Sequence, residues 1–158
     1  LLVKPVPRWQ IALAKLAVAA VLTAVLVVPP IIVTGVLVGG FGSASLAVAF
    51  GYAVAAIVGA AAYAAAFATL GTITSRALVV GLAYTLLWEG VLAGLLEGTR
   101  FMSVRQATLG IAAALTGEDP GVEALPVAVA VVVVAAVIVG SAVLTTSRLR
   151  RFQVRSPD

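Results

Sequence analysis

The stretch that decides the fold runs from residue 16 to residue 75 and reads LAVAAVLTAVLVVPPIIVTGVLVGGFGSASLAVAFGYAVAAIVGAAAYAAAFATLGTITS. It contains no charged residue. A helix needs about 20 apolar residues to cross the hydrocarbon core of a bilayer, so the stretch has room for two crossings. The sequence GGFGS at 39–43 is typical of a tight hairpin turn. We therefore expect transmembrane helices over 16–38 and 44–73, the first kinked at Pro29-Pro30.

The composition of the whole chain agrees with a membrane location. Of its 158 residues, 63% are hydrophobic and only 10% are charged, and the mean hydropathy is +1.21. Soluble domains carry about a quarter charged residues, so this chain cannot cover a soluble globule. It has no cysteine and no histidine, which excludes disulfides, the usual zinc sites and Ser-His-Asp or Cys-His catalysis. We expect neither an enzyme nor a cofactor of its own.

Two further spans follow the hairpin. A short polar break at Ser75-Arg76 precedes an apolar run over 77–96, and a run rich in valine and alanine covers 125–144. Between them, residues 97–124 hold most of the acids. Apolar residues at helical spacing within 99–115 predict an interfacial or re-entrant helix on the outer side, the alternative being an ordinary amphipathic loop helix that covers the ends of the spans. The expected fold is all-α: a single domain over 1–158, a bundle of four transmembrane helices, with a tail over 145–158.

The charges predict the orientation of this bundle. With four spans, one side of the membrane receives eight of the ten basic residues: Lys4, Arg8, Lys15, Arg76, Arg148, Arg150, Arg151 and Arg155. The other side receives two basic residues and most of the acids: Arg100, Arg105, Glu97, Glu118, Asp119 and Glu123. The positive-inside rule then places both termini in the cytoplasm of a multi-pass protein of the cell (plasma) membrane. Three or five spans would break this segregation.

The same placement decides which partners the net charge of +4 indicates. The basic residues flank the spans, so we expect them to face anionic membrane lipid rather than nucleic acid.

Small residues recur at every fourth position in two of the spans, a pattern that lets helices approach closely in lipid. The second span carries Ala47, Gly51, Ala55 and Gly59, and the third carries Gly90 followed by Gly94 and Gly98. These rows predict packing faces, although a chain rich in alanine and glycine also produces such rows by chance.

Glu89 is the only acid inside an expected span. An ionisable residue within a membrane is costly and is by default a hypothesis of function. Glu89 can take up a proton, bind a cationic substrate or pair with an arginine. The alternative is structural: hydrogen bonds from tyrosine, threonine or backbone groups hold the carboxyl group in place.

The N-terminal residues LLVKPVPRW at 1–9, followed by Ile11 and Lys15, resemble the permease subunits of ABC-2 type exporters. In that family a stretch reading roughly Leu-Leu-x-x-Pro-[Val/Ile]-Ser-Arg, with a lysine some seven residues on, lies on the cytoplasmic side of the third transmembrane helix. Pro5, Val6, Arg8 and Lys15 match this pattern, while Pro7 stands where serine is usual. The sequence ATLGTITSR at 68–76, the Trp88-Glu89-Gly90 triplet and the arginine-rich tail are also similar to the family.

This resemblance implies that the chain corresponds to the third to sixth helices of a six-span permease, with Leu1 as an internal start. It implies a path-forming subunit without its own ATPase site, a separate cytosolic subunit that binds and hydrolyses ATP, and a second permease copy or homologue in a dimer. Coupling contacts would lie at Pro5, Val6, Arg8 and Lys15. In agreement, neither lysine of the chain, Lys4 or Lys15, follows the glycine of a phosphate-binding loop.

Two other functions stay open at this point. One is an ion-coupled secondary transporter of the small multidrug exporter type that uses Glu89 as its proton site. In that family the essential glutamate lies in the first helix and the chains are shorter. The other is a membrane scaffold that transports nothing.

Overall fold

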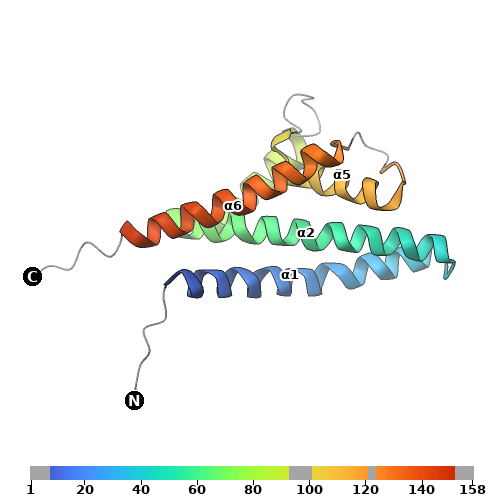
Figure 1. Ribbon diagram of the computed structural model, residues 1–158, viewed down its shortest axis with the longest axis horizontal. Coiled ribbons are helices and arrows are strands. Elements are labelled where there is room, and N and C mark those ends of the chain that lie inside the picture. The colour runs from blue at the N-terminus through green and yellow to red at the C-terminus, as the bar shows by residue number, and fades with distance from the viewer. Residues whose placement is uncertain (1–7, 93–100, 121–123, 152–158) are drawn as a thin grey trace, which may run out of the picture.

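A computed structural model describes residues 8–92, 101–120 and 124–151. Within these ranges the chain is helical and contains no β-strand, which confirms the all-α prediction. The helices are α1 (Arg8–Gly39), α2 (Ser43–Ile73), α3 (Ala77–Ala83), the π-helix η1 (Tyr84–Leu92), α5 (Val104–Thr116) and α6 (Val127–Arg151). Figure 1 shows α1, α2 and α6 as the three long helices, with α3 and η1 lying behind α6.

Three of these helices are long and apolar enough to cross a membrane, over Leu13–Gly39, Ser43–Ile73 and Val127–Ser147. Their large side chains are widely exposed, and Leu37 and Val38 are 80% and 85% exposed. Water would make so much exposed apolar surface unfavourable, whereas lipid tails accommodate it. The protein is therefore embedded in a membrane.

The predicted count of four continuous spans is not confirmed. Helix α3 runs directly into η1, but the apolar segment Ala77–Val91 is shorter than the three spans. At 1.5 Å per residue, a helix of this length rises about 22 Å, less than the hydrocarbon core of about 30 Å. Residues 93–96, which would complete the expected span over 77–96, lie outside the described residues.

Helix α5 lies lengthwise along α2 and runs in the opposite direction. A Cβ atom built on Gly59 would stand 2.6 Å from Cγ2 of Thr108, and one built on Gly51 would stand 2.4 Å from Cγ2 of Thr116. The first turn of α5 thus lies deep in the bundle, and its last turn points toward the α1–α2 turn (Figure 1). The prediction of an interfacial or re-entrant helix stays a prediction, and packing along α2 is compatible with the re-entrant form.

Together, α3 with η1 and then α5 pass from one end of the bundle toward the other in two pieces. The described part of the third predicted span ends at Leu92, and the next helix begins at Val104.

The predicted row of small residues in α2 is largely a packing face. Gly51, Ala55 and Gly59 are buried, whereas Ala47 is exposed. The row in the third span is different: Gly90 is exposed, and a Cβ atom built there would have no atom of another described helix within 4 Å. Gly94 and Gly98 lie outside the described residues.

The core of the molecule lies where α2, α5 and α6 meet. Its buried members are Ala62, Val104, Ala107, Leu125, Ala130 and Val134. The contact is close, since a Cβ atom built on Gly110 of α5 would stand 2.2 Å from the carbonyl oxygen of Leu125. We call α2, α5 and α6 the packed body.

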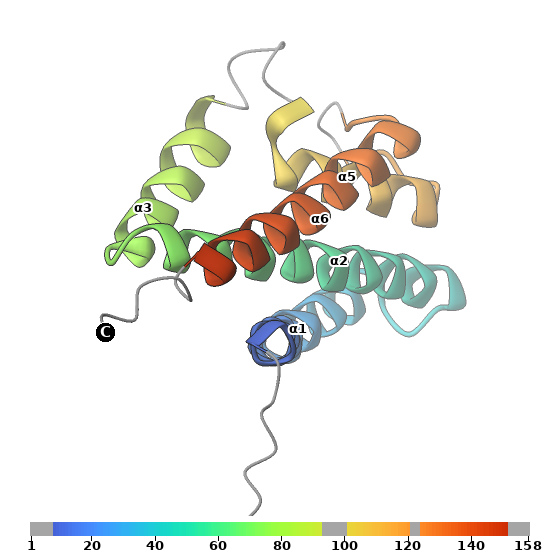
Figure 2. The same ribbon diagram turned by 60° about the vertical axis from the view of Figure 1, so that its left-hand side comes forward.

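Helix α1 is peripheral to the packed body. It packs along α2, closely at its far end, where a Cβ atom built on Gly35 would stand 2.5 Å from Cβ of Ala49. It has little contact with α6, and Figure 2 shows it on the far side of α2 from α5. The helix continues through Pro29 and Pro30, which cannot donate the hydrogen bonds that the carbonyls of Val25 and Leu26 would otherwise accept.

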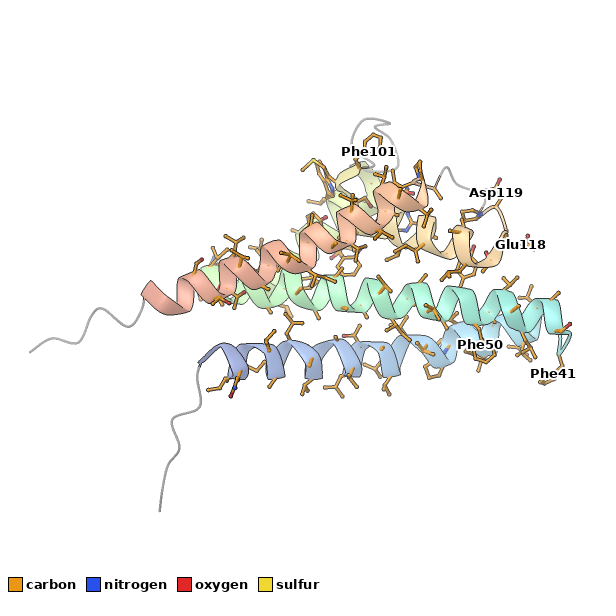
Figure 3. The ribbon with its side chains drawn as sticks, viewed as in Figure 1. Phe41, Phe50, Phe101, Glu118 and Asp119 are labelled. Carbon is orange, nitrogen blue, oxygen red and sulfur yellow. The ribbon has the colours of Figure 1, made fainter. Side chains whose placement is uncertain are left out.

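The two ends of the bundle differ in charge. The start of α1 at Arg8, the α2–α3 turn at Arg76 and the end of α6 at Arg151 lie at one end, which we call the basic end (Figure 1). Glu118 and Asp119 lie with Phe41 at the opposite end, next to the α1–α2 turn (Figure 3). Arg8, Arg76 and Arg151 are thus separated from Glu118 and Asp119 as the sequence predicted, whereas Arg105 lies in the first turn of α5 beside Glu89.

Candidate functional site at Glu89

Glu89 lies in η1, surrounded in sequence by the apolar residues of TLLWEGVL. Its side chain is 3% exposed. A buried carboxyl group is tolerated only where other groups replace the hydrogen bonds that water would supply. Its neighbours therefore decide what it can do.

Each oxygen of the carboxyl group accepts two hydrogen bonds. Oε1 accepts from the backbone N–H of Val104 at 3.0 Å and from the hydroxyl of Tyr84 at 3.1 Å. Oε2 accepts from the backbone N–H of Arg105 at 3.0 Å and from the hydroxyl of Tyr63. The four donors come from α2, η1 and α5, so one side chain ties three elements together.

The two backbone donors belong to the first turn of α5, where N–H groups have no partner within the helix. The helix dipole also places partial positive charge there, which favours a carboxylate. Ser103 completes the cap, because its Oγ accepts from the N–H of Gln106 at 3.1 Å. Glu89 and Ser103 thus satisfy the first three N–H groups of a helix that begins inside the bundle.

The π-helical form of η1 places Tyr84 and Glu89 together. A π-helix bonds residues five apart, so Tyr84 and Glu89 stand about one turn apart on the same face. The hydroxyl of Tyr84 also lies 3.3 Å from the carbonyl oxygen of Met102, just before α5. The wide turn therefore presents two polar side chains to the same helix start. Such segments occur frequently at functional sites.

Two polar atoms beside this cluster are buried and have no hydrogen-bond partner within the described residues. They are Nε1 of Trp88, a donor, and Oε1 of Gln106, an acceptor. Trp88 precedes Glu89 and Gln106 follows Arg105 in the chain. Both oxygens of the Glu89 carboxyl group have hydrogen-bond partners, while Trp88 and Gln106 keep one donor and one acceptor without a partner among the described residues.

This arrangement is suited to anchor the first turn of α5 to α2 and η1. All four positions around the carboxyl oxygens are occupied by groups of the same chain. Among the described residues, no group of three or more His, Cys, Asp or Glu side chains lies close enough to hold a metal ion. The structural alternative for Glu89 is the one that the geometry favours.

The sequence singled out Glu89 but not the residues that bind it. Tyr63 and Tyr84 carry no local signal that connects them to position 89. Ser103 does carry one, because Ser103 and Gln106 form the S-x-x-Q pattern of a helix start.

The other predicted site residues lie apart from Glu89. Pro5 and Val6 fall outside the described residues, and Arg8 is the first residue of α1. Lys15 is exposed on α1 and lines a cleft between α1, α2 and α6. The structure does not pair Lys15 with Glu89.

Comparison of the chain with family models, with curated proteins and with solved structures finds no match.

Proposed function

We propose that this chain is a membrane-spanning permease subunit of an ABC-2 type exporter. It forms part of the translocation path, while a separate cytosolic subunit hydrolyses ATP. The observation that carries the proposal is the peripheral position of α1, which directly follows the basic, proline-containing segment that resembles the family's coupling region.

Helix α1 is suited to transmit a movement. It begins at the basic end and packs along α2, with little contact to α6. A partner that contacts Pro5, Val6 and Arg8 would pull on the first turn of a long helix. Because α1 contacts α2 extensively but scarcely touches α6, it can slide as a rigid lever along α2.

The packed body supplies the fixed part of such a device. Glu89 joins η1 to the first turn of α5 and to Tyr63 of α2. A hydrogen bond to a charged group contributes about 1.5–3 kcal/mol, so the four bonds together resist separation of these elements. A movement of α1 changes its position relative to the other helices only if those helices stay fixed.

The chain needs another polypeptide to supply energy. Its two lysines, Lys4 and Lys15, do not belong to a phosphate-binding loop. In our proposal the ATP-binding subunit docks at the basic end, which faces the cytoplasm. The exposed apolar faces of the bundle then meet lipid and a second permease copy.

The test is purification of the tagged intact chain from its native membrane in a mild detergent, followed by identification of bound proteins and an ATPase assay. We expect an ATP-binding protein to co-purify. Arg8→Glu should lower its recovery, because the substitution reverses a charge at the docking segment. Glu118→Lys is the matched control, since it also reverses an exposed charge but at the opposite end of the bundle. Absence of a bound ATPase, together with transport that ignores ATP, would contradict the proposal.

The ion-coupled alternative makes a different prediction for Glu89. The four donors around the Glu89 carboxyl group come from the chain itself, as in a structural role. If Glu89 nevertheless carries protons, Glu89→Gln abolishes uptake driven by a proton gradient in vesicles. An ATP-driven exporter keeps part of its activity after the same change. A scaffold transports nothing in either assay.

A further inference from the structure

A cleft of about 910 Å³ opens between α1, α2 and α6 in the half of the bundle near the basic end. Its lining includes Lys15, Ala19 and Thr23 of α1, Phe67 and Gly71 of α2, and Thr145 of α6. Helices α1 and α6 scarcely touch, so the cleft lies between two helices that are both joined to α2. None of its lining residues belongs to the first turn of α5, but Tyr63, whose hydroxyl donates to Glu89, is among them.

The walls of the cleft offer little to a polar ligand. The hydroxyl of Thr23 donates to the carbonyl oxygen of Ala19 at 2.9 Å, and that of Thr72 donates to the carbonyl oxygen of Thr69 at 2.7 Å. These hydroxyl protons are used within their own helices. The remaining surface is mostly alkyl and aromatic, and it lies within segments that cross the membrane. An occupant must therefore have an apolar body.

Lys15 is the exception in this lining. It lies inside the apolar segment Leu13–Gly39, and its side chain is exposed. It makes no hydrogen bond or ion pair with any residue that the structure describes. A cation near the end of a membrane span reaches for water or for an anion at the interface. The cleft therefore combines apolar walls with one uncompensated positive charge.

We propose that this cleft binds one anionic phospholipid from the leaflet at the basic end. The phosphate of its headgroup lies at Lys15, and one acyl chain follows the wall past Ala19 and Phe67. The α1 wall from Lys15 to Thr23 rises about 12 Å, which is long enough to hold part of an acyl chain. Basic pockets between transmembrane helices bind anionic headgroups in this way. The proposal does not depend on a transport role.

The experiment is native mass spectrometry of the intact chain released from detergent with equal amounts of phosphatidylglycerol and phosphatidylcholine of the same acyl chains. We expect the wild-type chain to retain one phosphatidylglycerol about fivefold more than phosphatidylcholine, the preference that one lysine near the headgroups provides. Lys15→Gln should remove the preference and Lys15→Arg should keep it. Gly71→Leu should lower retention of both lipids, because a Cβ atom at Gly71 meets open space within the cleft.

Arg76→Gln is the matched control, since it removes one positive charge from the basic end but lies outside the cleft lining. A lipid preference that falls equally in Lys15→Gln and Arg76→Gln would show general surface attraction and overturn the proposal. Equal retention of the two lipids by the wild-type chain would also overturn it. So would a dimer that dissociates in Gly71→Leu without any lipid preference, because a second copy would then fill the cleft.

Discussion

Glu89 and Lys15 are both single charges within apolar helices, yet the molecule treats them in opposite ways. Glu89 is 3% exposed and accepts four hydrogen bonds from its own chain. Lys15 is exposed, and no described residue pairs with it. The difference teaches that a charged residue in a membrane span can have either of two roles. Glu89 holds helices of the same chain together, whereas Lys15 is available to a molecule outside the chain.

The contrast extends to the helices that carry the two residues. Around Glu89, glycines let α2, α5 and the start of α6 pack within van der Waals contact. Helix α1, which carries Lys15, packs on α2 and has little contact with α6. Substitutions in the two regions should therefore differ in cost, and the following four comparisons measure that difference from the largest effect to the smallest.

Glu89→Ala should give the largest loss of stability. It leaves two backbone N–H groups of α5 and the Tyr63 hydroxyl without their acceptor, and each unsatisfied buried donor costs about 1–3 kcal/mol. We expect a total of about 4 kcal/mol, measured as a lowered unfolding midpoint in detergent. Glu118→Ala removes an exposed acid and should leave the midpoint unchanged. Equal shifts of the unfolding midpoint in the two variants would contradict a special structural role for Glu89.

Gly110→Ala should be the next most costly change. The added Cβ atom would stand 2.2 Å from the carbonyl oxygen of Leu125, and α5 must move away from it. Overpacking of this kind costs about 1–3 kcal/mol. Gly71→Ala, in the cleft wall of α2, meets no atom within 4 Å and should stabilise its helix by up to about 1 kcal/mol. Opposite signs in the same thermal assay are the expected result, and a loss of similar size in both would contradict the packing described for α5.

Tyr63→Phe tests one hydrogen bond of the anchor without disturbing its shape. Oε2 of Glu89 keeps only the N–H of Arg105 as a donor, and we expect a loss of about 1.5 kcal/mol. Tyr52→Phe is the control on the same helix, because the Tyr52 hydroxyl makes no hydrogen bond with a described residue. The informative quantity is the difference between the two unfolding midpoints. No difference would mean that Tyr63 does not support Glu89.

Lys15→Leu should have the smallest effect on the unfolding of the lipid-free chain. The lysine gives up no hydrogen bond or ion pair with the described part of the chain. We expect an unchanged midpoint in a neutral detergent and a shift only when phosphatidylglycerol is added to the wild type. A large loss in the neutral detergent would place Lys15 among the residues that hold the fold together.

Much of the fold could be predicted from the sequence, because the features that determine it lie close together in the chain. The expected span over 44–73 corresponds to α2 at Ser43–Ile73. The glycine turn at 39–43 precedes its start, and the polar break at Ser75-Arg76 follows its end. The span over 77–96 was expected as one helix because its composition is apolar throughout. The π-helix and the position of α5 instead go with the hydrogen bonds from Val104 and Arg105 to Glu89, which periodicity does not reveal.

The site could be predicted only in part, because its contacts join residues that lie far apart in the sequence. Glu89 stood out as the single acid in an apolar run. Tyr63 lies 26 residues before it in sequence, and only the packing of η1 on α2 brings the two together. For Lys15, the sequence indicated a residue near the headgroups but not a cleft, because the cleft arises from the separation of α1 and α6 around α2.

The central claim is that the start of α1, the Arg76 turn and the end of α6 share the cytoplasmic face, where an ATP-binding partner could act on α1. Because the chain has no cysteine, single cysteines introduced as Arg76→Cys, Arg151→Cys and Glu118→Cys can be labelled in intact cells with a membrane-impermeant maleimide. The account predicts labelling of position 118 from outside, and of positions 76 and 151 only after the membrane is permeabilised. Labelling of positions 76 and 151 from opposite faces would contradict it.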